Sequence, residues 1–440
     1  MATSSKQAGA SGPFFVDLFA GCGGCSLGLE LAGFTPAYVN ELSLEPRWTY
    51  LANRLEAFDH LAVFNSRDIR TELGTNDQVD DLADGLKRHL GTDAKAGHLD
   101  LVIGGPPCQG YSGIGHRRSY AVDKTDLPSN YLYQDMVRVI EGLAPKIFLF
   151  ENVRGLLAAR WTPGGKRIWP DVWEAFQAIT TTIRGKPQRY VIRHEVVYAK
   201  DYGVPQNRPR LLMVGVREDI AAAVPDVLAS PGKQDAIATG LLPAGHPSSA
   251  PSLEDLLSDL VDPAYTPGQA VTTTYPGDPQ TAIQEQLRTG RDGHVAGGGA
   301  PLSDHEYSNH RPRIVEKFQY MLDHNGDIPA DMQTKKFAQR VLPRQWSDRG
   351  PTITATSLAD DYVHFEQPRS LTVREMARLQ TFPDWYQFKG KRTTGGLRRA
   401  GNPRQGLHER EVPKYTQVGN AVPVALAEAI GRHFRELLDR

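Results

Sequence analysis

The first half of the chain alternates short apolar runs with stretches of helical periodicity, and this alternation restricts the fold more than any other feature. The runs that indicate buried strands cover residues 14–19, 35–40, 99–103, 146–150, 191–197 and 211–216. Helical spacing of apolar residues lies between some of them, at 26–32 and 131–143. Because parallel strands need long and usually helical crossovers, the pattern predicts an α/β fold with a parallel, doubly wound sheet.

The amino-acid composition of the chain changes after Arg217. Pro, Gly, Ser and Thr are frequent from residue 225 to 312, and short helices are expected only at 253–260 and 313–322. A strong helical pattern returns at 422–438, with proline in the first turn, where a helix tolerates it. The sequence therefore predicts a separate, loop-rich domain or insertion after the α/β part.

Composition excludes several classes of protein without naming a partner. With 40% apolar and 23% charged residues among 440, the chain can bury a sizeable core and is not disordered as a whole. Fifty basic against 51 acidic residues give a net charge of −1, so a nucleic-acid surface would require local segregation of charge. Three cysteines suit a reducing compartment, and no apolar run reaches the ~18 residues of a membrane span. We expect a soluble intracellular protein whose residues 1–12 form a disordered tail without a signal peptide.

A glycine-rich loop, residues 19–24, follows the first strand and precedes a helix. Glycine there permits a tight turn and a close approach of the backbone to a ligand. A dinucleotide fingerprint would place glycine at position 26, which Ser26 occupies, so a nicotinamide cofactor is disfavoured. Glu41 ends the second strand, where a carboxylate can accept hydrogen bonds from ribose hydroxyls, and Asp68 could accept from an adenine amino group. The loop predicts a cofactor that contains a nucleoside.

Cys22 and Cys25 form a C-x-x-C pair inside this loop. A redox or zinc role is conceivable, but no second cysteine pair exists to complete the four ligands that zinc usually takes. We therefore expect neither a metal site nor a redox site.

Cys108 follows the segment Gly-Gly-Pro-Pro at the end of a predicted strand. In a doubly wound sheet this edge holds ligands, so Cys108 is a candidate nucleophile, although a buried structural thiol is the commoner fate of a lone cysteine. Glu151 ends the next strand and could lie nearby, and a thiol with a carboxyl group suits attack on a ring with proton donation. Arg208 and Arg210 offer guanidinium groups for a carbonyl or phosphate, with surface salt bridges as the alternative.

Six segments together resemble, in their order, the S-adenosylmethionine-dependent DNA (cytosine-5) methyltransferases of the bacterial type. They are the cofactor loop FVDLFAG at 15–21 with Gly23 and Gly24, the nucleophile motif GPPCQ at 105–109, ENV at 151–153, DYGVPQ at 201–206 with Arg208 and Arg210, RSLTVREMARLQTFPD at 369–384, and QVGNAV at 417–422. Together they span residues 14 to about 431.

The resemblance implies a role for each matched residue. The catalytic residues would be Cys108, Glu151, Arg208 and Arg210. The cofactor S-adenosylmethionine would contact Phe19, Ala20, Gly21, Gly23, Gly24, Glu41, Leu42, Asp68, Ile69, Pro106, Leu132, Asn420 and Val422, with no metal required. Contacts to DNA would come from Gln109, Ser112, Arg117, Arg118 and Gln206.

The family also implies an architecture, a Rossmann-like doubly wound sheet (class I methyltransferase) with a smaller, loop-rich target-recognition domain. We expect the catalytic domain at 13–217 plus 413–440, and recognition with a basic insertion at 218–412. Two stretches depart from compact members. The polar stretch 69–98 looks like an insertion, and 385–412 carries seven basic against two acidic residues, a surplus that could contact phosphates.

The implied reaction adds the Cys108 thiolate to C6 of a flipped-out cytosine, while Glu151 stabilises protonation at N3 and the arginines hold O2 and a nearby phosphate. Residues 111–130 are expected to form a mobile loop over the base. The partner would be double-stranded DNA, with a cognate restriction endonuclease that is not a stable subunit, and the enzyme a cytoplasmic, nucleoid-associated monomer. Alternatives are a transfer-RNA cytosine-5 methyltransferase on the same scaffold, a non-catalytic DNA-binding module and a nicotinamide oxidoreductase. Gln109 beside Cys108 and the long recognition interval favour DNA.

Overall fold

The structure is a computed structural model of the 440-residue chain. It describes residues 12–107, 125, 127–162, 164–222, 235–247, 250–268, 272–333, 339–345, 351–355, 361–394 and 411–440. Among the described helices, none combines the length and apolarity that a membrane crossing requires.

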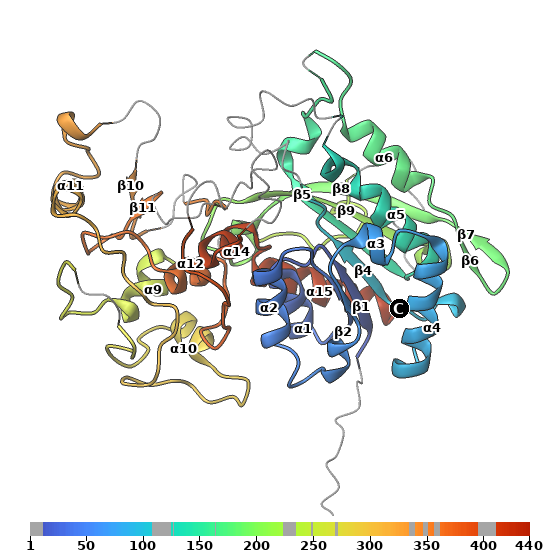
Figure 1. Cartoon of the computed structure of the whole chain (residues 1–440), viewed down its shortest axis with the longest axis horizontal. Coiled ribbons are helices and arrows are strands. Elements are labelled where there is room, and N and C mark those ends of the chain that lie inside the picture. The colour runs from blue at the N-terminus through green and yellow to red at the C-terminus, as the bar shows by residue number, and fades with distance from the viewer. Residues whose placement is uncertain are drawn as a thin grey trace, which may run out of the picture.

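A seven-stranded sheet organises the described part of the first half (Figure 1). Its strands, in spatial order, are β3 (Asn65–Ser66), β2 (Thr35–Asn40), β1 (Phe14–Leu18), β4 (Leu101–Gly104), β5 (Ile147–Val153), β9 (Pro209–Arg217) and β8 (Tyr190–Tyr198). The first five are mutually parallel, which confirms the doubly wound α/β class. The prediction of a fully parallel sheet is wrong for β9, which runs antiparallel to β5 and β8 because the chain between β8 and β9 is too short for a helical crossover.

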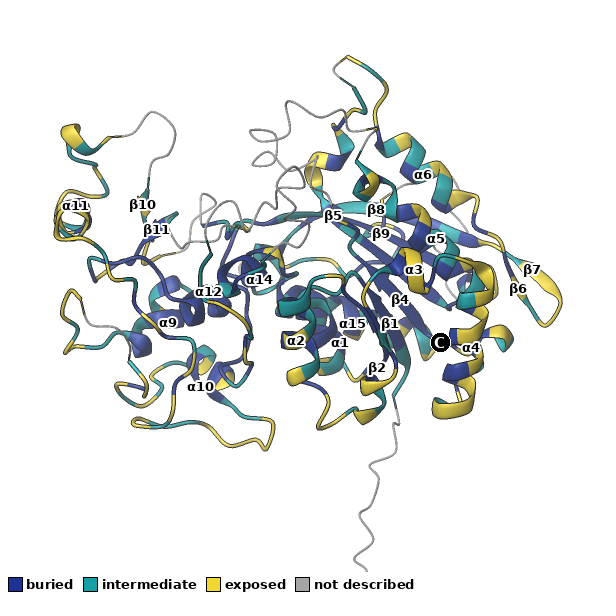
Figure 2. Cartoon of the chain, in the orientation of Figure 1, coloured by how far each residue is buried: buried dark blue, intermediate teal, exposed yellow. Residues whose placement is uncertain are grey.

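Helices cover both faces of the sheet, and successive strand residues alternate between two cores. One core joins Phe148 and Phe150 of β5 to α4 (Asn76–Leu90), α5 (Leu132–Leu143) and α6 (Trp169–Gln177). The opposite core joins Ile147 and Leu149 to α1 (Gly24–Leu31) and α15 (Val424–Leu438). Figure 2 shows the sheet as a buried layer between helices whose outer sides are exposed. Shorter elements here are α2 (Leu44–Ala52), α3 (Ile69–Glu72), α7 (Glu218–Ala221), β6 (Thr181–Ile183) and β7 (Lys186–Gln188).

Helix α4 lies within residues 69–98, the stretch that the sequence suggests is an insertion. Thr75 and Gln78 form a capping box at its start, and Gly91 ends it with a φ of 71°. Its buried side chains, among them Val79 and Leu86, pack in the core with α5. The helix lies in the connection between β3 and β4, and its polar outer face accounts for the polar composition of the stretch. That the stretch is an insertion stays a prediction.

The segment after β9 forms a second group of short elements, which lies to one side of the sheet in Figure 1. They are α9 (Leu253–Leu257), α10 (Ala282–Arg288), α11 (Pro312–Asp323), β10 (Arg340–Val341), β11 (Tyr362–Val363), α12 (Val373–Leu379) and α14 (Lys414–Asn420). Leucines of α9 share an apolar cluster with Phe382, Tyr386 and Tyr415. Arg378, fully buried, bonds both Asp259 at 2.5 Å and Asp384 at 2.6 Å, so paired charges hold segments with little regular structure together.

Candidate active site at the carboxyl edge of the sheet

Four parallel strands end at one edge of the sheet, and the predicted site residues follow them. The strands are β1, β2, β4 and β5. Strand β1 lies between β2 and β4, which is the switch point where open α/β sheets bind ligands. The fold therefore brings the glycine loop, Glu41, Pro106 and Glu151 to one edge, as the sequence predicted.

The glycine loop has an unusual backbone that its sequence explains. Gly21 and Gly23 have φ values of 57° and 85°, which suit glycine, while Phe19 adopts a φ of 59° that is rare for a residue with a side chain. The N–H of Gly21 donates to Glu41 Oε2 at 2.8 Å, and the N–H of Ser43 donates to Oε1 at 2.7 Å. Glu41 is thus fixed beside the loop, and its burial raises the pKa of the carboxyl group.

Other predicted cofactor residues differ in how far their side chains are exposed to a ligand. Asp68 caps α3 by accepting from the N–H of Arg70 at 3.0 Å and is partly exposed. The side chain of Ile69 belongs to the core, 3% exposed, so only its backbone can face a ligand. Leu42, by contrast, is 58% exposed next to Glu41, and Leu132 is half-buried at the start of α5.

The closing segment reaches the glycine loop from the far end of the chain. A Cβ at Gly24 would lie 2.4 Å from the carbonyl oxygen of Val422, so only glycine permits this approach. Asn420 is exposed at the end of α14. The structure therefore places Ala421 and the predicted residue Val422 against the loop, although about 400 residues separate them from it in sequence.

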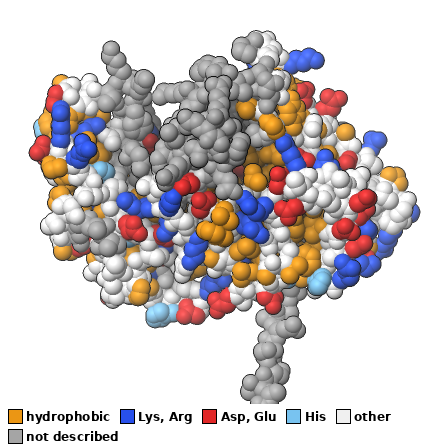
Figure 3. Space-filling model, in the orientation of Figure 1, with side chains coloured by type: hydrophobic (Ala, Val, Ile, Leu, Met, Phe, Trp, Pro, Cys, Tyr) orange, Lys and Arg blue, Asp and Glu red, His pale blue; other side chains and the backbone are white. Residues whose placement is uncertain are grey.

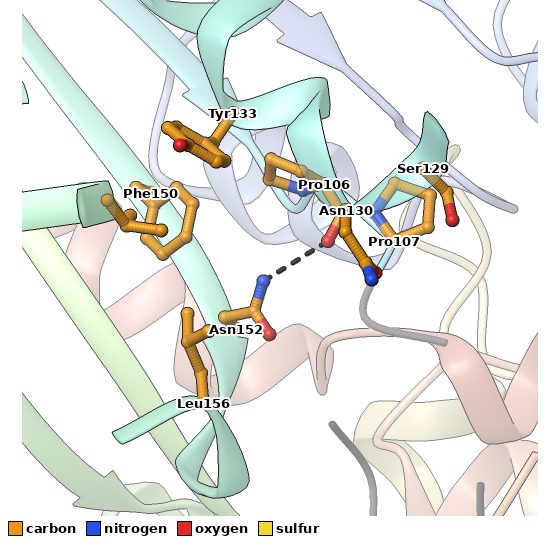
Figure 4. Close-up of a pocket in the computed structure, with 9 residues that line it drawn as sticks. Pro106, Pro107, Ser129, Asn130, Tyr133, Phe150, Asn152 and Leu156 are labelled. Carbon is orange, nitrogen blue, oxygen red and sulfur yellow. Dashed lines mark hydrogen bonds between the residues drawn. The ribbon is translucent and has the colours of Figure 1, made fainter. Parts of the chain in front are cut away.

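Asn152 holds the diproline segment that leads to Cys108. Its side-chain amide donates to the carbonyl of Pro106 at 3.1 Å, and its oxygen accepts from the N–H of Val153 at 2.9 Å. Figure 4 shows this contact at a small pocket lined by Pro106, Pro107, Ser129, Asn130, Tyr133, Phe150, Asn152, Leu156 and Val172. The predicted residues Cys108, Gln109, Ser112, Arg117 and Arg118, and most of 111–130, lie outside the described residues.

Glu151 and Arg210 form an ion pair on the other side of β5. Arg210 Nε lies 2.6 Å from Glu151 Oε1, with the two side chains 11% and 18% exposed. The pair arises because β5 and β9 are hydrogen-bonded neighbours. A Cβ at Gly105 would lie 3.0 Å from Glu151 Oε2, so the carboxylate packs against the backbone three residues before Cys108. An oriented carboxyl group and a guanidinium fork can together bind a planar, polar ring edge.

Two predicted site residues just before β9 are buried and bonded to distant parts of the chain. The guanidinium of Arg208, 2% exposed, donates to the carbonyls of Ile353 (2.6 Å), Gly419 (2.7 Å) and Ala421 (3.0 Å). It ties the start of β9 to the closing segment. Gln206 is fully buried and bonds Leu379, Gln380 and Ile353, so its side chain has no exposed surface in this structure. These partners favour a structural role for both residues, which sequence alone could not indicate because it does not tell which way neighbouring polar side chains point.

Arg54 is a residue that sequence reasoning missed. It is fully buried below the glycine loop, where it donates to the carbonyl of Gly23 at 3.0 Å and pairs with Glu30 at 2.5 Å. It also donates to the hydroxyl of Tyr386, which in turn donates to the carbonyl of Cys22 at 2.5 Å. No local motif marks Arg54, because its partners come from three distant segments.

The two cysteines of the loop are buried or partly buried and not bonded to each other. The thiol of Cys22 donates to the carbonyl of Gln417 at 3.4 Å, and burial raises its pKa to about 12. Burial also raises the pKa of Cys25. Neither is a reactive thiolate at neutral pH in this setting.

Two of the three described basic residues in the stretch 385–412 are paired with acidic residues, and the third, Lys389, donates to the side-chain oxygen of Gln387. Lys391 lies 2.6 Å from Glu411, and Arg392 lies 3.3 Å from Glu306. Arg398, Arg399, Arg404 and Arg410 lie outside the described residues. The phosphate contacts expected from this stretch stay a prediction.

Comparison with known proteins agrees with this geometry. The model of the C-5 cytosine-specific DNA methylase family matches residues 14–436. The Type II methyltransferase M.DdeI of Desulfomicrobium norvegicum is 30% identical over 430 residues, which cover 94% of this chain and 86% of that protein. M.XorII of Xanthomonas oryzae is 30% identical over 448 residues, covering 97% and 85%. A crystal structure described as a candidate DNA modification methyltransferase encoded within an E. coli prophage shares the fold, with a TM-score of 0.62, 22% identity and coverage of 97% and 100%.

The sheet and its edge define a Rossmann-like α/β methyltransferase. The chain belongs to the C-5 cytosine-specific DNA methylase family and is a DNA (cytosine-5) methyltransferase.

Proposed function

We propose that this enzyme transfers a methyl group from S-adenosylmethionine to C5 of a cytosine flipped out of a specific double-stranded DNA sequence, through a covalent bond between Cys108 and C6. The observation that carries the proposal is the Glu151–Arg210 pair, 2.6 Å apart at the sheet edge and packed against the backbone that leads to Cys108. Family membership supports the substrate class.

The residues around the glycine loop fit the proposed cofactor. A Cβ at Gly21 would meet no atom within 4 Å, so the outer side of the loop is open to a ligand. Glu41 could accept from ribose hydroxyls, and the exposed Leu42 offers an apolar surface for a purine ring, with Asp68 close by in sequence. Asn420 and residues 421–422 would close the site from the other side. When bound there, S-adenosylmethionine supplies an electrophilic methyl group.

The chain's own residues would activate the cytosine. The Cys108 thiolate adds to C6, which makes C5 an enamine-like carbon nucleophile. Glu151 stabilises the proton on N3, and Arg210 both orients Glu151 and faces O2 of the ring. After C5 has gained its methyl group, loss of the C5 proton restores the ring and expels Cys108. Arg208 takes no part in these steps.

We further propose the catalytic domain at 13–217 plus 413–440, with target recognition at 218–412. The apolar cluster around α9, α12 and Tyr386 differs from the two cores of the sheet and supports a second folding unit, which packs on the first domain through Cys22, Leu27 and Val424. The packing of α15 against α1 supports a discontinuous first domain. The relatives named Type II methyltransferases support a role as the modification enzyme of a restriction–modification pair, protecting one site from a cognate endonuclease.

Two linked experiments test the proposal. Bisulfite sequencing of DNA from a host expressing this chain alone should show one methylated sequence. A duplex with 5-fluorocytosine at the mapped target should then remain covalently bound to the protein after methyl transfer, because fluorine cannot leave as a cation. The adduct should require the cofactor, vanish in Cys108→Ser and persist in the matched control Cys25→Ser. Trapping of modified transfer RNA and not of DNA would overturn the assignment, and no adduct on an active enzyme would exclude the covalent route.

A further inference from the structure

A basic hairpin follows β5 at the edge that carries Glu151. Residues 154–168 contain four basic side chains, Arg154, Arg160, Lys166 and Arg167, and no acidic one. All four side chains belong to exposed residues, and none makes an ion pair within the described part of the chain. The hairpin rises above α6 at the top of Figure 1, and Figure 3 shows basic side chains at the same end of the molecule.

The backbone of the hairpin forces two like charges together. Arg160 and Arg167 are opposed in an antiparallel bridge. The bonds from Trp161 N to Lys166 O (3.1 Å) and from Ile168 N to Ala159 O (3.0 Å) flank them. They are therefore a non-hydrogen-bonded pair, the type whose Cα atoms come within about 4.5 Å and whose side chains share one face. Like charges in that position are destabilising, unless an anion lies between them.

The hairpin is fixed in position. The Trp161 ring stacks on Tyr131, with centroids 5.1 Å apart and planes at 16°, and its indole N–H donates to Asp171 at 2.6 Å. Leu156, at the base of the hairpin, lines the same pocket as Pro107, the neighbour of Cys108. These contacts hold the four cations beside the edge at which a cytosine would enter.

We propose that this hairpin is a phosphate-binding surface that holds the backbone of duplex DNA beside the flipped base, with one phosphate seated between Arg160 and Arg167. The inference rests on the proposed function, since a duplex that delivers a base to Glu151 must pass its backbone over the surfaces that border this edge. An exposed arginine pair without an acid partner suits a phosphate, which accepts from two guanidinium forks.

The test is the salt dependence of binding to a duplex that contains the mapped target. Loss of the one phosphate that the two arginines neutralise should reduce the magnitude of the slope of log K against log [NaCl] by about 0.9. Binding should weaken roughly 5-fold at about 0.15 M salt if only counterion release is lost. We expect this for Arg160→Gln with Arg167→Gln. The double lysine variant, Arg160→Lys with Arg167→Lys, should keep the wild-type slope. Maximal turnover should be unchanged and KM for DNA raised.

The matched control removes two exposed cations elsewhere, with Arg88→Gln in α4 and Lys186→Gln in β7. Its slope should equal that of the wild type. A glutamine double variant with the control's slope would refute the hairpin as a DNA contact. The binding test does not involve turnover, so it can refute the hairpin contact without affecting the proposed function. The proposed function fails by a different result, namely if the wild-type enzyme methylates no DNA.

Discussion

Replacing Arg208 should destabilise the fold, whereas replacing Arg210 should impair the reaction. Arg208 makes three hydrogen bonds to carbonyls at 2.6–3.0 Å in a buried setting. Lysine keeps the charge, but its single ammonium group cannot reach three carbonyls that diverge. If two charge-assisted hydrogen bonds are lost, at about 1.5–3 kcal/mol each, their sum sets an upper limit on the loss of unfolding free energy. Because the surrounding groups relax, we expect Arg208→Lys to lower the unfolding free energy by about 2–4 kcal/mol.

This loss is a large part of a typical stability of about 5–15 kcal/mol, so the variant should fold but unfold at a lower urea concentration. Arg210→Lys should change the unfolding free energy by less than about 1 kcal/mol, because a partly exposed ion pair contributes little. Its methyl transfer rate should fall, since a lysine cannot match the guanidinium fork.

The assay compares urea unfolding followed by circular dichroism with single-turnover methyl transfer for the two variants and the wild type. Arg208→Lys should also bind the cofactor more weakly, because two of its bonds hold the carbonyls of Gly419 and Ala421, on either side of Asn420. A wild-type unfolding midpoint with abolished turnover in Arg208→Lys would refute our reasoning and return Arg208 to the base-binding residues.

Four other changes test the site and its support. Cys108→Ser should abolish methyl transfer and leave DNA affinity unchanged in a binding titration, because a hydroxyl is barely ionised near neutral pH; turnover like that of the wild type would remove this residue from the mechanism. Glu41→Ala should weaken cofactor binding by about 1.5–3 kcal/mol in calorimetry without altering DNA affinity, and an unchanged cofactor affinity would make its role structural. Gly28→Ala should lower the unfolding free energy by about 1–3 kcal/mol in urea unfolding. The added methyl group would lie 2.5 Å from the carbonyl oxygen of Val424 and would force α1 and α15 apart. A stabilised variant would show that the two helices can move apart without cost. Burial raises the pKa of Asp17 to about 7, so the stability held by its protonated form is lost as pH rises towards 7. Asp17→Asn should therefore gain stability relative to the wild type as pH rises from about 4 to about 7, and parallel pH profiles of the two proteins would contradict that pKa.

The sequence by itself determined the class of fold and the reaction. Apolar runs that are followed by glycine or proline mark strands, and local sterics suffice to place the breaks, so the predicted runs 14–19 and 99–103 correspond closely to β1 and β4. The candidate site followed because parallel strands end at one edge, which brings Glu41 and Glu151 to the same side of the sheet whatever the details of packing. The tight turn of the loop was also predictable, because the positive φ at Gly23 is a local conformation that glycine adopts readily.

Only the tertiary structure decided which polar side chains are functional. Arg208 and Arg210 are two residues apart around the start of β9 and look alike in sequence. Arg208 nevertheless donates to the carbonyls of residues 353, 419 and 421, while Arg210 forms an ion pair with Glu151. The roles of Gln206 and Arg54 likewise depend on partners more than 20 residues away. Burial and hydrogen bonding are properties of the assembled chain, because the free energy of a polar group depends on which distant atoms replace the water around it.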